Sequence, residues 1–193
     1  MARPRSEDKR KAILKAAAGV FAERGIADAP TSAIARAAGV ADGTLFTYFE
    51  SKSELMDALY LDLRQRIGQA LAEVADDADP RVWLRAIWER YLRLGADHRD
   101  WMRVLAQLRA AGRLFKEDEP EHPAILGVVD AVCRAADSDL HGLSAEYMVL
   151  ALRAQAEATI EYIHAHPEQA ENCRELGFRM LWRGLRGNRA FAD

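Results

Sequence analysis

One stretch, residues 31–52, constrains the fold more than any other part of the chain. It reads as two short helices, about Thr31 to Ala38 and about Gly43 to Phe49, with Gly39 between them. A helix that ends in a tight turn favours a residue with positive φ, and glycine adopts that conformation without strain. This spacing predicts a helix-turn-helix, whose second helix lies in the major groove of DNA. The small side chain of Ala35 would let the second helix cross close over the first, and the apolar contacts that would lock the crossing come from Ile34, Ala38, Val40, Leu45 and Tyr48.

The second helix of this motif presents small or polar residues on its outward side. They are Asp42, Gly43, Thr44 and Thr47. A helix built only for packing has no need of Gly-Thr at its start, whereas a helix that approaches phosphates and base edges can use small residues there. The alternative is an ordinary helical hairpin in an all-α domain, because loose helix-turn-helix patterns occur by chance. Several independent positions agree here, which favours DNA binding.

The sequence around the motif carries a family resemblance. The segments RKAILKAAAGVFAERGI and IARAAGVADGTLFTYFESKSEL resemble the N-terminal domain of the tetracycline-repressor (TetR) family of bacterial regulators. Two departures bear on the DNA contacts that this resemblance implies. Pro30 occupies the first place of a Thr or Ser pair that family members usually carry, so that only Thr31 and Ser32 follow. Phe46 stands where the family usually has a tyrosine, whose hydroxyl commonly contacts a phosphate.

Two residues next to the motif are candidates for contacts with the DNA backbone. Lys52 lies in the first turn of the following helix, where a cation is unfavourable for the helix dipole unless a phosphate lies nearby. Tyr48 is open to two interpretations, since its ring can pack while its hydroxyl reaches the phosphate that Phe46, without a hydroxyl, cannot bind. The predicted DNA contacts are Thr31, Ser32, Asp42, Gly43, Thr44, Phe46, Thr47, Tyr48 and Lys52.

Charge is distributed unevenly along the 193 residues, whose formal net charge is −3. Residues 1–52 hold nine Lys and Arg against six Asp and Glu, and the remainder holds eighteen against twenty-four. A mildly basic head on an acidic body suits a protein that touches DNA at one end only. The N-terminus lacks an apolar signal region, and no apolar run reaches the length of a membrane span. We therefore expect a cytoplasmic protein with no membrane contact.

Apolar periodicity predicts an all-α fold of about nine helices. Gly25 and Gly95 are predicted to end helices. The expected domains are a three-helix helix-turn-helix head for DNA binding, residues 1–52, and a helical ligand-binding and dimerisation body, residues 53–193. Outside the motif we expect helices over 7–24, 52–74, 82–94, 99–110, 124–136, 144–164 and 167–185, with a linker at 76–80 and an acidic loop at 115–123.

The last two helices carry apolar residues on more than one face, which is typical of helices buried on two sides. One face can fill the core of the monomer while another packs against a second subunit. The TetR resemblance implies a homodimer formed through these two helices as a four-helix bundle. The predicted interface consists of mostly small residues that allow close approach: Ala151, Ala154, Ala158, Gly177, Leu181 and Gly184.

The body also holds many aromatic residues for its size. Core packing explains each of them, but together they make an apolar cavity among the middle helices plausible, and the TetR resemblance implies a ligand-binding body. Gln107 and Arg153 are further polar candidates inside such a cavity. The predicted ligand contacts are Trp88, Tyr91, Trp101, Leu105, Phe115, Tyr147 and Gln155.

The sequence lacks the common signatures of catalysis. It contains no glycine-rich phosphate loop, GxSxG elbow, HExxH or CxxC, and its five histidines share no metal-ligand spacing. Cys133 and Cys173 fit helical patterns as small buried hydrophobes. We therefore predict no catalytic residue, no metal site and no cofactor.

These observations and the resemblance predict a ligand-responsive DNA-binding transcriptional regulator. We expect a repressor that binds a palindromic operator as a homodimer and is released by a small apolar ligand. The alternative is a helical enzyme or interaction protein in which the helix-turn-helix is vestigial. Local autoregulation, which the resemblance implies, would distinguish the two.

Overall fold

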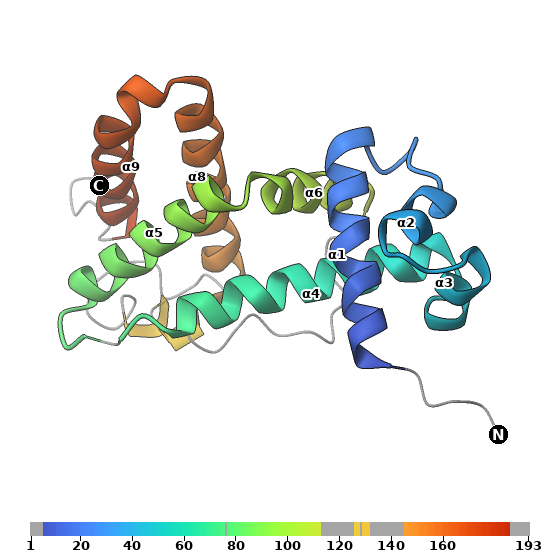
Figure 1. Ribbon diagram of the computed structural model, residues 1–193. Coiled ribbons are helices and arrows are strands. Elements are labelled where there is room, and N and C mark those ends of the chain that lie inside the picture. Colours follow the sequence, from blue (N-terminus) through green and yellow to red (C-terminus); the bar gives the residue numbers. More distant parts are fainter. Residues whose placement is uncertain (1–5, 76, 113–125, 128, 132–144, 186–193) are drawn as a thin grey trace. The chain divides into compact units, whose positions relative to one another are not determined.

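The computed structural model describes residues 6–75, 77–112, 126–127, 129–131 and 145–185. Its described residues form helices and no strand, which confirms the predicted all-α fold (Figure 1). None of the helices in these ranges is long and apolar enough to cross a membrane. The elements are α1 (Glu7–Arg24), α2 (Thr31–Ala37), α3 (Asp42–Tyr48), α4 (Lys52–Ala72), α5 (Pro80–Asp97), α6 (Arg99–Ala110), α8 (Ala145–Ala165), the 3₁₀ helix η2 (Pro167–Gln169) and α9 (Ala170–Leu185).

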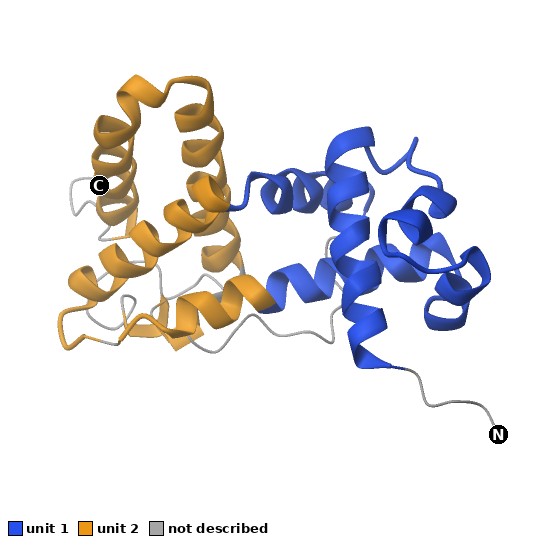
Figure 2. Cartoon of the chain, viewed as in Figure 1, with its two compact units in different colours: residues 1–65, 98–118 blue, residues 66–97, 119–193 orange. Residues whose placement is uncertain are grey.

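The chain divides into two compact units (Figure 2). Unit 1 comprises residues 1–65 and 98–118, and unit 2 comprises residues 66–97 and 119–193. Unit 1 therefore contains the residues predicted as the DNA-binding head, the first part of α4 and all of α6. The predicted functional boundary after residue 52 stays a prediction. Most of the predicted helix over 124–136 and the acidic loop at 115–123 lie outside the described residues.

The core of unit 1 forms where α1 packs against α2 and α6. Arg103 of α6 donates from Nη1 to the carbonyl of Ala22, 3.2 Å away, and Gln107 Oε1 accepts the N–H of Ile26 at 3.1 Å. Helices leave their last carbonyls without intrahelical partners, so α6 satisfies backbone groups at the C-terminal end of α1. Gln107 is a predicted polar residue of the ligand cavity, but in the structure its side chain accepts this hydrogen bond from the backbone of Ile26. The largest fully buried side chains of this unit are Ile13, Leu14, Phe21, Ile34, Leu45, Phe49, Leu55, Leu59, Leu63 and Leu105.

Gly95 does not end α5, and the prediction that it does is wrong. The helix continues to Asp97, and Gly95 is buried at the place where α5 packs on α8. A Cβ at Gly95 would clash with the side chain of Ile160. This glycine therefore permits a close helix crossing, whereas Gly25, with φ of 81°, does end α1 as predicted.

A second close approach in unit 2 joins α5 to α9. A Cβ built on Gly177 would lie 2.7 Å from Trp88 Cζ2 and 3.2 Å from Thr159 Oγ1. Trp88 donates its indole N–H to the carbonyl of Arg174 at 3.1 Å, and Gln155 of α8 donates to the carbonyl of Gly177 at 2.8 Å. Hydrogen bonds and ring packing thus converge on one turn of α9.

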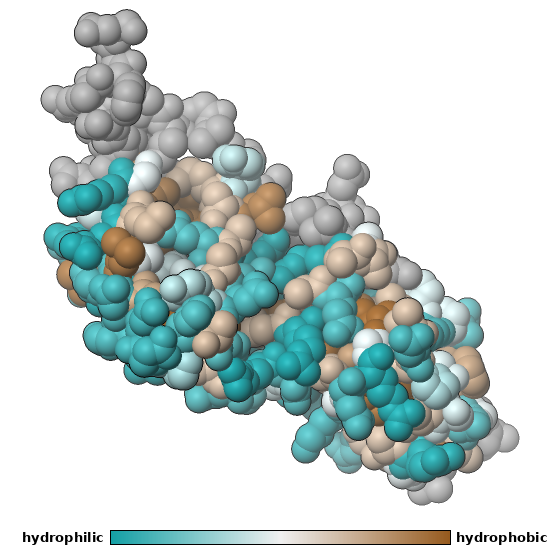
Figure 3. Space-filling view, turned by 90° about the horizontal axis from the view of Figure 1, so that it is seen from above, coloured by the Kyte–Doolittle hydropathy of each residue, from teal (hydrophilic) through white to brown (hydrophobic). Residues whose placement is uncertain are grey.

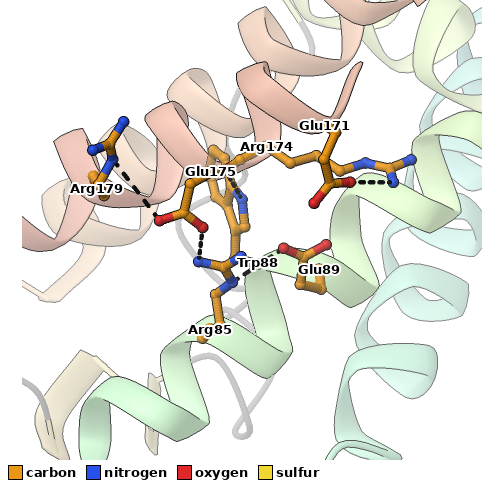
Figure 4. Close-up of polar contacts among 7 residues, drawn as sticks. All are labelled: Arg85, Trp88, Glu89, Glu171, Arg174, Glu175 and Arg179. Atoms are coloured by element: carbon orange, nitrogen blue, oxygen red, sulfur yellow. Dashed lines mark hydrogen bonds and ion pairs between the residues drawn. The ribbon is translucent and has the colours of Figure 1, made fainter. Parts of the chain in front are cut away.

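Charged side chains on the same helices extend this contact (Figure 4). Arg85 of α5 donates to Glu175 of α9 at 2.6 Å and to Glu89 at 3.1 Å, and its guanidinium lies 4.8 Å from the centre of the Phe178 ring. Arg179 approaches Glu175 from within α9 at 3.8 Å. The hydrogen bond from Arg85 is the main reason that the pKa of Glu175 lies below its ordinary value of 4.5.

We expect Gly177→Ala to destabilise the protein by about 1–3 kcal/mol, because the added methyl group meets the Trp88 ring. This cost exceeds the gain of at most about 1 kcal/mol that alanine brings to a helix interior. Urea unfolding followed by circular dichroism measures it. The matched control is Gly19→Ala in the middle of α1, where nothing lies within 4 Å of the new Cβ, and this variant should be as stable as the parent or more so. Equal effects of the two substitutions would contradict the assigned role of Gly177.

The pKa of Glu175 predicts a pH-dependent contribution to stability. A carboxyl whose pKa is lower in the folded state stabilises that state above its unfolded pKa, and the contribution is lost as the pH falls through the folded pKa. The melting temperature of Glu175→Gln should therefore lie below that of the parent at pH 7, and the two should converge as the pH falls from 4.5 through the lowered pKa of Glu175. Glu171→Gln is the control, since Glu171 lies 3.8 Å from Arg174 and is 89% exposed, and it should show a smaller difference from the parent at pH 7.

Candidate functional site

The turn between α2 and α3 fixes the crossing of the two helices. Gly39 has φ of 67°, as predicted for the residue between them. Its N–H donates to the carbonyl of Arg36 at 3.1 Å, and the N–H of Val40 donates to the carbonyl of Ala35 at 3.0 Å. Ala35 is fully buried, which lets the helices approach closely. The backbone therefore forms the predicted helix-turn-helix.

The second helix of the motif, α3, is anchored along one side. Leu45 is fully buried and Phe49, which follows the helix, is 1% exposed. The Tyr48 hydroxyl accepts the backbone N–H of Ser6, directly before α1, at 2.8 Å. The ring of Tyr48 is half-buried, so both interpretations of this residue apply in part: the ring packs and the hydroxyl has an internal partner. That oxygen still has its own proton to donate.

The other side of α3 is open to solvent. Asp42, Gly43 and Thr47 are exposed, Phe46 is 46% exposed, and Thr44 is half-buried. The Thr47 hydroxyl donates to the carbonyl of Gly43, one turn earlier, at 2.9 Å. On α2, Ser32 is exposed and Thr31 half-buried. Asp42, Gly43, Phe46 and Thr47 thus share one exposed face of a short helix.

Lys52 has internal partners that the sequence did not reveal. Its ammonium donates to the carbonyls of Ala29 at 2.7 Å and Ala27 at 3.3 Å, in the segment between α1 and α2, and lies 5.9 Å from the centre of the Phe21 ring. These two carbonyl acceptors offset the unfavourable interaction between the Lys52 cation and the dipole of α4 at its first turn. An ammonium group has three N–H donors, so one remains beyond these two carbonyls.

The predicted ligand contacts are divided between the two units. Trp88 and Gln155 come together around Gly177, and Tyr91 donates from its hydroxyl to Glu157 at 3.1 Å, all in unit 2. Trp101 and Leu105 belong to α6 in unit 1, where Trp101 stacks on His98 with ring centres 3.9 Å apart. Tyr147 is 56% exposed, and Phe115 lies outside the described residues.

The residues predicted for the dimer interface fall into an exposed group and a buried group. Ala151, Ala154, Ala158 and Gly184 are exposed, whereas Gly177 and Leu181 are buried inside unit 2 and do not lie on that surface. Sequence reasoning missed larger exposed apolar side chains that follow the same helical spacing. These are Tyr147, Leu150 and Tyr162 on α8, and Leu176 and Met180 on α9; apart from Leu150 they belong to apolar stripes visible in the sequence, and what the prediction left out is their part in the interface set.

We call these five residues, together with the four exposed small ones, the outer face of α8 and α9. Exposed apolar side chains thus recur along two helices that pack on each other. In the space-filling view, apolar side chains reach the surface in separate patches between polar ones (Figure 3). Among the described residues no group of three or more His, Cys, Asp and Glu could hold a metal ion.

Comparison with known proteins identifies the N-terminal part of the chain first. Residues 13–59 match the sequence model of bacterial regulatory proteins, tetR family. The fatty acid metabolism regulator protein of Bacillus subtilis (strain 168) is 31% identical over 91 residues, which span 45% of this chain and 45% of that protein. The chain therefore matches less than half the length of this curated relative.

Solved structures extend the likeness to nearly the whole chain. A TetR-like transcriptional regulator from Rhodococcus sp. RHA1 is 25% identical with a TM-score of 0.67, over 97% of this chain and 100% of that one. FadR from Bacillus subtilis in complex with stearoyl-CoA is 19% identical with a TM-score of 0.63, over 90% and 98%, and shares the fold. The geometry of the helix-turn-helix, the match over residues 13–59 and this likeness agree, and the N-terminal part of the chain belongs to the tetR family of bacterial regulatory proteins.

Proposed function

We propose that this chain is a transcriptional repressor that binds a palindromic operator as a homodimer and is released by a small ligand. The observation that carries the proposal is the geometry of α3, which is anchored by Leu45 and Tyr48 and exposes Gly43 and Thr47. A short, rigidly held helix with small side chains on its free face suits close approach to base edges in the major groove.

The outer face of α8 and α9 supports the dimer. A two-fold pair of identical chains would bury this face and would present two copies of α3 to the two halves of a palindrome. Small residues along the centre of α8 and at Gly184 would allow the helices of the partner to approach, and Leu176 and Met180 take the places that the sequence assigned to Gly177 and Leu181.

The body would hold the ligand in unit 2. Support comes from the fold it shares with a stearoyl-CoA-bound FadR and from the name of the Bacillus relative, which both suggest a compound with a fatty acyl chain. A ligand that weakens operator binding must itself bind more weakly to the DNA-bound protein by the same factor. An enzyme in which the motif is vestigial is disfavoured, because the compared proteins are regulators by name.

Footprinting on the DNA that flanks the gene tests the proposal. We expect protection of a two-fold symmetric site, and the affinity for that site should exceed the affinity for scrambled DNA of equal length by at least about a thousandfold. Equal affinity for both DNAs would overturn the proposal.

Lys52→Gln tests the contact with the DNA backbone. If the remaining N–H of Lys52 meets a phosphate in each subunit, the slope of log affinity against log salt should fall by about 2 per dimer, on operator and scrambled DNA alike. The variant should also melt at a lower temperature, because the carbonyls of Ala27 and Ala29 lose their ammonium donor. A lower melting temperature with an unchanged slope would limit Lys52 to holding the segment between α1 and α2.

Met180→Glu and Ala154→Glu test the dimer. A charge on the outer face of α8 and α9 should shift the sedimenting species from twice the chain mass towards one chain mass, and operator affinity should fall together with dimer content. Ala106→Glu is the matched control, because Ala106 is an exposed alanine on α6, and it should stay dimeric. Dimers that persist in both outer-face variants would show that another surface forms the interface.

A further inference from the structure

We infer that Thr47 acts towards the operator as a hydrogen-bond acceptor only, and therefore faces a base that presents an amino group, adenine N6 or cytosine N4. The inference rests on the proposed function, in which α3 lies in the major groove. It specifies which base of one pair in each half-site lies against Thr47, namely the base that carries the amino group in the major groove.

The hydroxyl of Thr47 has a single proton, and that proton has a partner within the helix. The distance from Thr47 Oγ1 to the carbonyl oxygen of Gly43 is 2.9 Å. A carbonyl oxygen carries no hydrogen, so the hydroxyl must be the donor in this bond. What remains for an incoming base is the lone pairs of Oγ1 and the methyl group of the same side chain.

The surroundings leave these lone pairs accessible. Thr47 is exposed, and nothing lies within 4 Å of the position that a Cβ would take at Gly43. Gly43 does not have positive φ, so neither backbone strain nor internal packing requires glycine there. A bare backbone at Gly43 leaves the Thr47 hydroxyl beside open space on the exposed side of the helix.

The four bases fall into two classes according to the groups that they present in the major groove. Guanine offers the acceptors N7 and O6, and thymine offers the acceptor O4 next to its methyl group. Adenine offers the N6 amino donor and cytosine the N4 amino donor. A threonine oxygen whose proton is already bound to Gly43 can pair with the last two alone. To donate to guanine or thymine, Thr47 would have to give up its bond within the helix.

The test uses an operator selected from random DNA by the parent protein, with the operator then altered one base at a time. Adenine is replaced by 2-aminopurine, which lacks the amino group in the major groove, and cytosine by 2-pyrimidinone, which lacks N4. Each DNA is titrated with the parent, with Thr47→Val, which keeps the shape without the hydroxyl, and with Thr47→Ser, which keeps the hydroxyl without the methyl. Circular dichroism confirms that all three proteins are folded.

At one position in each half-site, loss of the amino group should lower the operator affinity of the parent and of Thr47→Ser by roughly three- to tenfold. This is the ratio expected for one net hydrogen bond. Thr47→Val should show no such loss there. Effects of the altered bases on base pairing cancel, because the three proteins meet the same DNA. At every other position the three proteins should respond alike.

Two results would overturn the inference while leaving the proposed function intact. One is an operator in which the loss of affinity in Thr47→Val depends on the acceptor of a guanine or thymine and not on the amino group of its pairing partner, and the other is an operator in which no amino group distinguishes Thr47→Val from the parent. A parent protein that selects no sequence at all would overturn the proposed function, and the inference with it.

Discussion

A helix of seven residues does not hold itself together in water, because forming the first turn costs more than a few hydrogen bonds return. Both helices of the motif, α2 and α3, have this length, so unit 1 must supply their position. Burial of Leu45 and Phe49 fixes one side of α3, and the bond from Ser6 to the Tyr48 hydroxyl ties its last turn to the start of α1. The position and orientation of the exposed side of α3 therefore depend on the whole of unit 1.

Local signals predicted most of the helices and their ends. Gly25 and Gly39 mark turns because each must adopt positive φ, and such a requirement is readable from neighbouring residues. Gly95 carries the same signal in the sequence but a different role in the structure. Glycine is needed at this position because the side chain of Ile160, far along the chain, packs against it. No local pattern distinguishes a glycine that ends a helix from one that lets another helix approach.

The candidate site was predictable where exposure followed from helical spacing, as at Gly43 and Thr47. It was not predictable where the partner was backbone. The acceptors of Lys52 are the carbonyls of Ala27 and Ala29, which leave no trace in side-chain identity. On α9 the sequence could not separate Gly177 from Gly184, because the difference depends on which of them meets the Trp88 ring of α5.

The position of α6 has a consequence for how such proteins diversify. The chain leaves unit 1 within α4 and returns to it at His98, and Arg103 and Gln107 then bind the backbone at the end of α1. A single genetic crossover after the helix-turn-helix would pair this α1 with an α6 from another lineage, without the side chains that fit it. A transferable reading module would thus consist of two separate gene segments, and chimaeric sensors built from this chain should carry both.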